Sequence, residues 1–309
     1  MMTYKVSVIL PCYNGARWIG QAVKSVLSQT YENFELIIID DGSIDGSRDV
    51  IASYLEDKRV HYIYQSHKGF SAAINRGIKE ADGDLIGFIG QDDLWLSNKL
   101  EIQVKFFEKH PDVDLVCSNY FLINAKGQIT GVTNTEIPKV SSREKLIEKL
   151  FLENFIGFET VLVKKECFYR VGFFDENMVG FSDHDMWLRI AGEFNINGFI
   201  EKPLVMKREH ELQLSKVKIN DVLKDEFIII KKAITYYPFL RKSVSKKLAS
   251  LYYKRGVTLL QKGDIQGAKE QFLKVIKYQP WKYKAIIAYI VPILYRFILN
   301  TIKRYTGAP

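Results

Sequence analysis

The chain has 309 residues, of which 47% are hydrophobic and 26% charged, as in a globular protein. Its length exceeds that of most single domains, so one large domain with a smaller appended part is expected. Cys12, Cys117 and Cys167 are odd in number and widely spaced, which excludes a disulfide framework and a C-x-x-C zinc site and favours a reducing, cytoplasmic location. The first apolar run, from Val6, ends at Pro11 and is too short for a signal peptide.

Charge is distributed unevenly along the chain. Residues 221–309 hold 18 lysines and arginines against 5 acidic residues, a net charge of +13. Since the whole chain has a net charge of +8, residues 1–220 have a net charge of −5. This difference predicts two parts with different partners. The lysines of the basic part are spread along helical stretches between large aliphatic residues, which argues against nucleic acid. Two interpretations stay open: a solvated helix face and an anionic membrane surface.

The segment from Val6 to about Asn124 alternates strand and helix patterns, which predicts an α/β fold with a parallel sheet. Short runs of branched apolar residues mark the strands, and apolar spacings of three and four mark the helices. Strands are predicted at residues 6–10, 36–39, 60–65, 85–89 and 115–123. Beyond Gly127 the alternation stops, with helices expected at 143–152, at 164–171 and from 182, and a strand at 199–206.

Two aspartate-bearing turns each follow one of these strands. Asp40 and Asp41 follow the strand at 36–39, and Asp92 and Asp93 come soon after the strand at 85–89. Open α/β sheets bind ligands at the carboxyl ends of their strands. Acidic side chains placed there suit a divalent cation and the hydroxyl and imide donors of a nucleotide, and phosphate then arrives with the metal. The pattern therefore predicts a metal-dependent enzyme acting on a nucleotide sugar.

Over roughly residues 5–215 the chain resembles the glycosyltransferase family 2 enzymes, which have the GT-A fold. The motifs that carry the resemblance are VSVILPCYN at 6–14, DDGS at 40–43, NRG at 75–77, DDLW at 92–95, GFFDE at 172–176, SDHDMWLR at 182–189 and REH at 208–210. The resemblance implies a Rossmann-like nucleotide-sugar-binding domain at residues 1–215. Its donor half would occupy about 1–125 and its acceptor half about 126–215.

The resemblance assigns the donor nucleotide to the first two turns. Pro11, Tyr13 and Asn14 belong to the first turn, and Tyr13 would pack against the base or the ribose. Asp40 would accept a hydrogen bond from the base, with Asp41 beside it. For both aspartates the alternative is an ordinary helix-entry turn with carboxylates near a helix N-terminus.

Asp92 and Asp93 stand where the family has its metal site, so the resemblance implies Mn²⁺ or Mg²⁺ bridging the diphosphate of a donor that is most readily UDP-linked. Such a metal offsets the charge that the departing nucleoside diphosphate gains. Asp92 thereby also contacts the donor. Arg208 and His210 match a basic motif near the diphosphate, as a donor-binding cation and a further metal ligand, with a solvated strand end as the alternative. Gly90 departs from the family, which often has another aspartate there, and which of the two aspartates contacts the metal stays open.

Asp183 is the predicted general base. The family inverts configuration by direct displacement, so the acceptor hydroxyl must lose its proton as it attacks, and a carboxylate within hydrogen-bond reach can take it. Asp183 begins a predicted helix, and an acid stabilised by backbone N–H groups is the alternative role. His67 stands where the family often has asparagine and is interpreted as a solvent-facing loop residue.

The predicted function is non-processive transfer of a sugar to a hydroxyl of a glycan or lipid-linked acceptor in glycan or polysaccharide biosynthesis. The Q-x-x-R-W motif of processive synthases and their multiple membrane spans are not found in the sequence. Neither G-x-G-x-x-G after the first strand nor a P-loop occurs, which argues against a dehydrogenase and a P-loop kinase. The alternative is a non-catalytic binding or scaffold protein that retains the fold, which Gly90 favours.

Residues 216–309 are predicted to form a basic helical extension. The spacing of apolar residues at about 249–280 is that of one tetratricopeptide-like hairpin, either capping the main domain or binding a peptide. Residues 285–304 are apolar but interrupted by Pro292 and Arg296, which favours an amphipathic helix in a membrane interface over a spanning one. This would give peripheral contact at the inner face of the cell membrane. A helix packed on protein or at a dimer interface is the alternative.

Overall fold

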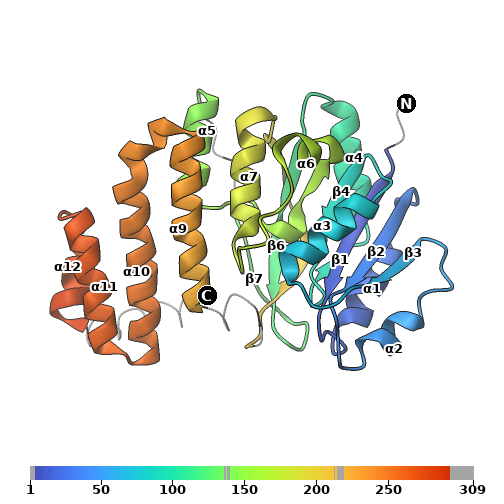
Figure 1. Ribbon diagram of the computed structural model, residues 1–309, viewed down its shortest axis with the longest axis horizontal. Helices are drawn as coiled ribbons and strands as arrows, with labels where there is room; N and C mark the ends of the chain where they lie inside the picture. Colours follow the sequence, from blue (N-terminus) through green and yellow to red (C-terminus); the bar gives the residue numbers. More distant parts are fainter. Residues whose placement is uncertain (1–3, 136, 138–139, 212, 214–218, 293–309) are drawn as a thin grey trace. The chain divides into compact units, whose positions relative to one another are not determined.

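The computed structural model describes residues 4–135, 137, 140–211, 213 and 219–292 (Figure 1). The chain divides into two compact units. The first comprises Met1–Ile147 and Asn154–Ile229, and the second comprises Glu148–Glu153 and Ile230–Pro309. The first unit mixes helices and strands, and the second is helical.

A twisted sheet forms the centre of the first unit. In the described residues its strands run in the order β3-β2-β1-β4-β8-β6-β9-β5, with β7 paired to β6, and β3, β2, β1 and β4 are parallel. The strands are β1 (Val6–Cys12), β2 (Phe34–Asp40), β3 (Val60–Tyr64), β4 (Leu85–Phe88), β5 (Leu94–Trp95), β6 (Leu115–Ile123), β7 (Ile129–Val132), β8 (Leu162–Lys164) and β9 (Gly198–Arg208).

Helices connect these strands and continue after the sheet. They are α1 (Ile19–Leu27), α2 (Ser47–Ala52), α3 (Phe70–Glu80), α4 (Lys99–Lys109), α5 (Arg143–Leu152), the short 3-10 helix η1 (Phe158–Thr160), α6 (Lys165–Val171), α7 (Ser182–Glu193) and α9 (Ile219–Tyr236). The five strands predicted before residue 124 are confirmed within two residues at each end, as are the later helices and the strand near residue 200. The sequence patterns did not reveal α4, β5, β7 or β8.

Both faces of the parallel strands are covered by helices. Val8 and Leu10 of β1 pack in one core with Val23 of α1. Ile9 faces the opposite way, toward α3, where a Cβ on Gly77 would lie 2.5 Å from Ile9 Cγ2. Burial on both sides explains why these strands read as continuous apolar runs without alternation.

The strand register brings the predicted turns to one edge of the sheet. Cys12 at the end of β1 pairs with Asp40 at the end of β2, which in turn pairs with Tyr64 at the end of β3. On the other side of β1, Ile9 pairs with Phe88 at the end of β4. The turns after β1, β2 and β4 are therefore neighbours at the carboxyl edge, the usual ligand side of such sheets.

The second unit is built from η2 (Pro238–Ser243), α10 (Val244–Lys262), α11 (Ile265–Tyr278) and α12 (Tyr283–Ile290). α10 and α11 form a hairpin that turns at Gly263, whose left-handed φ of 90° ends α10. Asp264 then caps α11 by accepting the Gly267 N–H at 2.8 Å. Gly256 lets the two helices approach, since a Cβ there would lie 2.7 Å from the Phe272 ring. This hairpin spans the stretch interpreted as tetratricopeptide-like.

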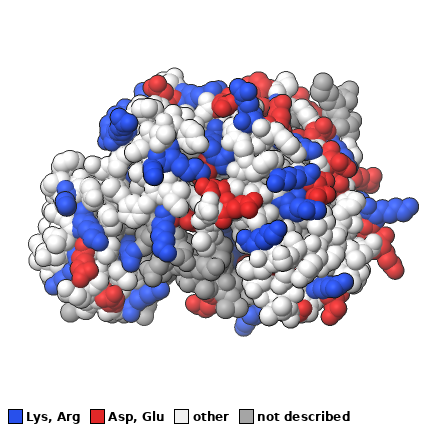
Figure 2. Space-filling model, in the orientation of Figure 1, with Lys and Arg blue, Asp and Glu red and all other residues white. Residues whose placement is uncertain are grey.

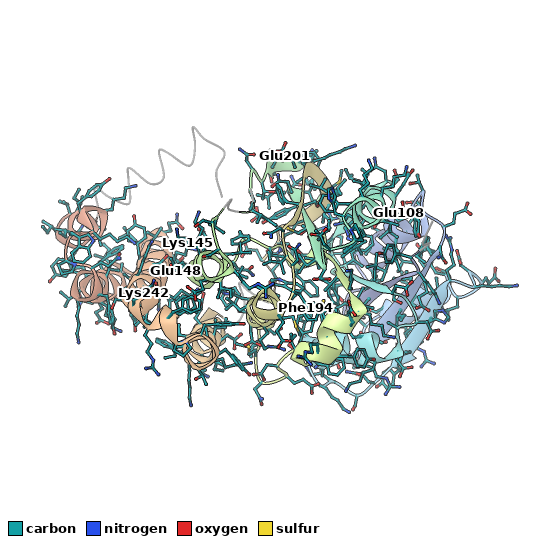
Figure 3. All side chains as sticks on the ribbon, turned by 90° about the horizontal axis from the view of Figure 1, so that it is seen from above. Glu108, Lys145, Glu148, Phe194, Glu201 and Lys242 are labelled. Carbon is teal, nitrogen blue, oxygen red and sulfur yellow. The ribbon has the colours of Figure 1, made fainter. Side chains whose placement is uncertain are left out.

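Lys and Arg side chains are scattered among uncharged ones over the visible face of the second unit (Figure 2). Within this unit Glu148 accepts a hydrogen bond from Ser243. Figure 3 labels Glu148 and also Lys242, which precedes Ser243 in the sequence. No helix in the described part of the chain is long and apolar enough to cross a membrane. Most of the predicted amphipathic segment at 285–304 lies outside the described residues, which end at Pro292.

Candidate active site

The turn after β1 is fastened to both neighbouring turns. The Tyr13 N–H donates to Gln91 Oε1 at 2.9 Å, and Gln91 Nε2 donates to the Tyr13 carbonyl at 3.2 Å. Asn14 has a positive φ of 50°. Its N–H donates to Ser43 Oγ at 3.0 Å, and its Oδ1 accepts the Ile44 N–H at 2.9 Å. The three turns thus form one hydrogen-bonded rim.

Asp40, at the end of β2, is only 1% exposed. Its Oδ1 accepts the Ser43 N–H at 2.8 Å, and its Oδ2 accepts the Tyr62 hydroxyl at 2.7 Å. Burial, followed by the hydrogen bond to Asp40, raises the pKa of Tyr62, so this hydroxyl stays protonated as a donor. Pro11 is buried beside Ile39 on the neighbouring strand. Asp40 is therefore oriented by protein donors, and its contact with a base stays a prediction.

Asp41 holds the loop that follows β3. Its Oδ1 accepts Gln65 Nε2 at 2.7 Å and the Lys68 N–H at 2.9 Å. Its Oδ2 accepts the Gly69 N–H at 2.8 Å and lies 2.8 Å from His67 Nδ1. A carboxylate has about four acceptor sites, and the loop occupies that number here. Asp41 is only 3% exposed and anchors this loop through these hydrogen bonds, and its contact with the donor stays a prediction.

His67 lies against the ring of Tyr13, with ring centroids 4.1 Å apart and planes at 23°. Gly42 permits this approach: its φ is +80°, and a Cβ there would lie 2.8 Å from the His67 nitrogen. Tyr13 is 43% exposed and the His67 side chain 52%, so the pair is open to a ligand. His67 is solvent-exposed, as the sequence interpretation has it, and in the structure it also forms half of an aromatic platform next to Asp41.

Asp92 meets His210 across the site. Asp92 Oδ2 lies 2.6 Å from His210 Nε2, and the centroid of the His210 ring lies 4.4 Å from that of Trp18, the N-cap residue of α1, with the ring planes tilted by 39°. The histidine side chain is 10% exposed and the aspartate side chain 22%. Among the described residues, His210 Nδ1 is buried without a hydrogen-bond partner. The two residues are 118 positions apart and come together because β9 pairs with β5.

Arg208 ties this corner together. Its backbone N–H donates to Asp93 Oδ1 and its Nε to the Asp92 carbonyl, both at 2.8 Å. Nη2 donates to Gln21 Oε1 on α1 at 3.0 Å, and Nη1 reaches two carbonyls after β6 at 3.3 Å. Arg208 is only 1% exposed, and its guanidinium donates these hydrogen bonds to groups of the protein itself. The predicted donor contact of Arg208 stays a prediction.

Asp93 is 3% exposed, and its pKa is raised well above the usual value by burial and then by the charges of Glu159 and Asp92. A Cβ on Gly90 would lie 2.7 Å from Asp93 Oδ2 and 3.0 Å from Asp92 Oδ1. The carboxylates thus occupy the space that a side chain at position 90 would need. A glycine at position 90, where the family often has an aspartate, leaves room for these two carboxylates.

Glu159 of η1 and Lys207 of β9 form an ion pair between the two acidic regions, with Lys207 Nζ 3.1 and 3.2 Å from the glutamate oxygens. Burial alone would lower the pKa of Lys207, but the charges of Glu159 and Asp93 outweigh it and raise that pKa. The same pair acts on the pKa values of both Asp93 and Asp183. Nothing local in the sequence singles out Glu159, and Lys207 is visible only as the neighbour of a motif.

Asp183 lies in the first turn of α7 and is partly buried. Its Oδ1 accepts the His184 N–H at 2.8 Å, and its Oδ2 accepts Asn154 Nδ2 at 3.1 Å. Burial raises its pKa to about 6, with the Glu159 charge adding to the effect and Lys207 opposing it. A carboxylate with such a pKa is well suited to accept a proton near neutral pH.

Helix α3 links the later motifs to the donor half. Asn75 Oδ1 accepts the Phe174 N–H at 2.9 Å, and its Nδ2 donates to the Phe174 carbonyl at 2.9 Å and to Glu176 Oε1 at 2.8 Å. Ser71 donates to Ser182 Oγ at 2.9 Å. The NRG motif therefore holds the GFFDE motif in place, and the start of α3 holds the residue before Asp183.

The donor set suits a metal ion that is only partly coordinated by protein. In the described residues, no group of three or more His, Cys, Asp or Glu side chains is arranged to hold a metal. Asp92 and His210 nevertheless place a carboxylate oxygen and an imidazole nitrogen 2.6 Å apart at the carboxyl edge, and Asp93 follows Asp92 in the same turn. Mg²⁺ typically takes one or two carboxylates and completes its shell with phosphate and water, so these residues fit such an ion.

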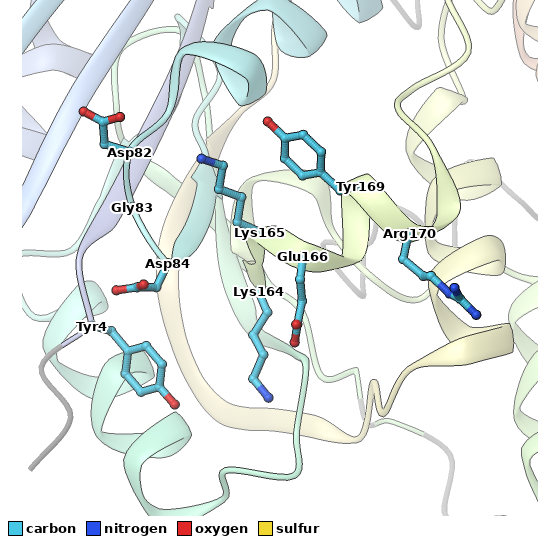
Figure 4. A pocket seen from close by; sticks show the side chains of 9 residues that line it. All are labelled: Tyr4, Asp82, Gly83, Asp84, Lys164, Lys165, Glu166, Tyr169 and Arg170. Carbon is cyan, nitrogen blue, oxygen red and sulfur yellow. The ribbon is translucent and has the colours of Figure 1, made fainter.

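A separate open cavity of about 760 Å³ lies at the opposite edge of the sheet (Figure 4). Tyr4, Asp82 and Asp84 line it from the segments before β1 and β4, and Lys165 and Tyr169 of α6 face them. Both acidic and basic side chains line it. Its position at the amino ends of the strands separates it from the candidate site.

Comparison with known proteins gives the same family as the motifs. Residues 7–172 match the profile of Glycosyl transferase family 2. An uncharacterized glycosyltransferase of Rickettsia typhi is 32% identical over 220 residues, which cover 70% of this chain and 68% of its own. The UDP-Glc:alpha-D-GlcNAc-diphosphoundecaprenol beta-1,3-glucosyltransferase WfgD of Escherichia coli is 32% identical over 206 residues, 65% of this chain and 76% of its own.

The fold is also shared with a solved structure. The crystal structure of S. aureus TarS 1-349 in complex with UDP-GlcNAc has a TM-score of 0.65 and 17% identity, and the match covers 97% of this chain and 92% of that chain. At this identity the likeness concerns the fold, an α/β GT-A domain followed by helices. With the profile match and the relatives above, the chain belongs to glycosyltransferase family 2 and is a glycosyltransferase of glycan biosynthesis.

Proposed function

We propose that the chain transfers one sugar at a time from a UDP-linked donor to a hydroxyl of a glycan or lipid-linked acceptor, with inversion and with Mn²⁺ or Mg²⁺. The Glu159–Lys207 ion pair is the main support, because its charges act on both Asp93 and Asp183. The candidate metal side and the candidate base, 90 residues apart in the sequence, would thereby border on one site.

The donor would lie along the rim formed by the turns after β1, β2 and β4. Tyr13, stacked on His67, offers a face for the base, and Asp40 an oriented acceptor. Asp92 and His210 would hold the metal, with Asp93 next to them. The metal, when bound, supplies positive charge that offsets the charge developing on the departing diphosphate.

Asp183 would act on the acceptor. As the acceptor oxygen bonds to the anomeric carbon and the bond from that carbon to the phosphate oxygen breaks, the hydroxyl proton passes to the carboxylate of Asp183. Asn154 and the His184 N–H hold the two oxygens of this carboxylate, so its orientation is fixed before the acceptor binds. One displacement on the face opposite the leaving group inverts the configuration.

UDP as the nucleotide is supported by the names of two similar proteins, WfgD, a UDP-Glc-dependent transferase, and TarS, solved with UDP-GlcNAc. WfgD also acts, by its name, on a diphosphoundecaprenol-linked acceptor. Peripheral membrane contact of the second unit would suit such an acceptor. Exposed Trp281, Tyr283 and Ile290 lie here near Lys282 and Lys284, a combination that favours anionic bilayer surfaces.

Trp281 supplies a native probe for that contact. It is 76% exposed, whereas Trp18, Trp95 and Trp187 are buried. If the second unit binds acidic vesicles, the fluorescence of Trp281 should shift to the blue and become less accessible to acrylamide, and Trp281→Phe should lose the change. If acrylamide quenches Trp281 equally with and without vesicles, and the protein does not sediment with them, membrane contact is removed from the proposal.

Isothermal titration of UDP with and without Mn²⁺ tests the donor site. Replacement of both Asp92 and Asp93 with alanine should abolish the Mn²⁺-dependent part of UDP binding and sugar transfer. Asp82→Ala, at the opposite edge of the sheet, is the matched control and should bind as the unmodified protein does. Retention of metal-dependent affinity by the double variant, with an unchanged melting curve, would remove the metal site from the proposed mechanism.

A further inference from the structure

Asp225 of α9 is a buried acid outside every motif that the sequence offered. It is 1% exposed. Its Oδ2 accepts three consecutive backbone N–H groups, from Val179 at 3.0 Å, Gly180 at 2.6 Å and Phe181 at 3.1 Å, and its Oδ1 lies 3.2 Å from the Val179 nitrogen. Successive N–H groups that converge in this way form an anion-binding concavity. In this chain a carboxylate from the same unit occupies it.

The three N–H groups belong to the segment that leads directly into α7. Phe181 is the N-cap residue of α7 and makes no side-chain cap hydrogen bond, and Ser182 and Asp183 follow as its first two residues. Asp225 therefore orders the segment immediately before the first turn, where a capping side chain is missing. Charge-assisted hydrogen bonds of this kind are the strong class.

Asp183 is consequently held from three directions. Asp225 fixes the segment before it, Ser71 of α3 bonds to Ser182 at 2.9 Å, and Asn154 bonds to the carboxylate itself at 3.1 Å. A general base must be placed to within a fraction of an ångström of its working position. Ser71 and Asn154 lie within residues 7–172, which match the family profile, whereas Asp225 lies beyond them.

We infer that Asp225 is a positioning residue for Asp183, which makes the first part of α9 a component of the catalytic machinery. This role rests on the proposed function of Asp183 as the base. Asp225 does not reach the reacting atoms in this role. It acts by keeping residues 179–181, and with them the start of α7, in one conformation. α9 lies after residues 7–172, which match the family profile, so this support is added by the helical region that follows.

Asp225→Asn is the direct variant, because it keeps the size of the side chain and removes the charge that three N–H groups share. Displacement of a reacting group by about 1 Å can cost on the order of 10²-fold in rate, so kcat should fall by up to that factor. The Kd of UDP with Mn²⁺ should not change, because Asp92, His210 and Tyr13 are not touched. Asp225→Glu, which restores the charge, should recover part of kcat.

Asp264→Asn is the matched control. Asp264 also receives a backbone N–H, that of Gly267, but it caps α11 in the second unit. Asp225→Asn should lower the melting temperature and kcat, whereas Asp264→Asn, whose amide oxygen still accepts the Gly267 N–H, should leave kcat unchanged. If Asp225→Asn lacks a cooperative melting transition, Asp225→Ser replaces it, since a hydroxyl accepts an N–H without leaving a buried amide, and the same outcomes apply.

The decisive comparison is a double-variant cycle with Asp183→Asn. Because Asp225 acts through Asp183, Asp225→Asn should reduce transfer in the unmodified protein and have little further effect in the Asp183→Asn background. Equal reductions in both backgrounds, or a normal kcat for Asp225→Asn while Asp183→Asn is nearly inactive, would overturn the positioning role. Full transfer by Asp183→Asn alone would instead refute the proposed base.

Discussion

At the end of β2, Asp40 and Asp41 bond to donors from the protein itself, a tyrosine hydroxyl, backbone N–H groups and side chains of the loop after β3. In the turn after β4, Asp93 receives the Arg208 N–H and lies close to other carboxylates, which with burial raise its pKa. Both pairs follow buried parallel strands and look alike in the sequence. Their surroundings differ because one turn meets a loop rich in N–H donors and the other meets η1 and β9.

The difference separates two uses of a buried carboxylate. Where donors saturate it, as at Asp41, the group is an anchor that shapes the site and has little capacity left for a ligand. Where burial and neighbouring acids raise the pKa, as at Asp93 and Asp183, the charged form is poorly compensated and invites a cation or a proton. The account therefore expects the first turn to affect UDP binding without metal, Asp92 and Asp93 to affect its Mn²⁺-dependent part, and Asp183 to affect chemistry.

The largest effect is expected at Asp183. Because a positioned base contributes about 10²–10⁴-fold, Asp183→Asn should lower kcat by that order. The Kd of UDP measured by calorimetry should stay the same, since Asp183 bonds to Asn154 and its own helix and not to the donor turns. Transfer by Asp183→Asn at close to the unmodified rate would break the comparison, because the buried acid would then be structural as well.

A smaller effect is expected at Gly90. In Gly90→Ala the new Cβ would displace the carboxylates of Asp92 and Asp93, so Mn²⁺-dependent UDP affinity should fall on the order of 10–100-fold, as for other changes that disturb metal ligands. The fold should tolerate it, because side-chain ends can rotate away. Gly46→Ala is the control: its Cβ would meet its nearest neighbour at 3.9 Å. Unchanged affinity in Gly90→Ala would mean that these carboxylates do not hold the metal.

Asp41→Asn should affect binding more than chemistry. The amide would turn N–H groups toward the donors of the loop, so the loop and the Tyr13–His67 pair should loosen. A loss of about 1.5 kcal/mol, the lower end for one hydrogen bond to a charged group, corresponds to roughly tenfold weaker UDP binding. Asp57→Asn, which removes a surface ion pair with Arg59, should leave UDP binding intact. A fall in kcat at saturating donor, with normal affinity, would contradict the anchor role of Asp41.

Much of the fold follows from local patterns. The apolar runs that became β1, β2 and β4 and the turns after them are read from composition alone, because burial on both faces leaves a continuous signal. Helix α4 was missed for an equally physical reason. Its buried face includes Lys99 and Gln103, which bond to each other at 2.6 Å, and these polar residues interrupt the apolar period.

The motifs located the residues of the site but not their partners. The contacts of Asp41 with residues 65–69, of Glu159 with Lys207 and of Asp225 with residues 179–181 each join segments at least 24 positions apart. Such pairings are set by strand order and by the packing of loops, which leave no local trace in composition or spacing. The sequence pattern therefore identified Asp40 and Asp93 in the same way, as acidic residues after buried strands. Only their neighbours in the structure show that their roles differ.

The pH dependence of transfer tests this distinction most directly. A base with a pKa of about 6 is ionised above that pH, so kcat/KM should be constant at higher pH and fall by about tenfold per unit below 6. Asp41→Asn should keep this midpoint despite weaker binding, and the residual transfer of Asp183→Asn should lack it. The groups that act on Asp183 are Lys207, Glu159, Asn154 and the His184 N–H, so Glu159→Gln should lower the midpoint. A midpoint near 4 in the unmodified protein, or one that moves in Asp41→Asn, would contradict the account.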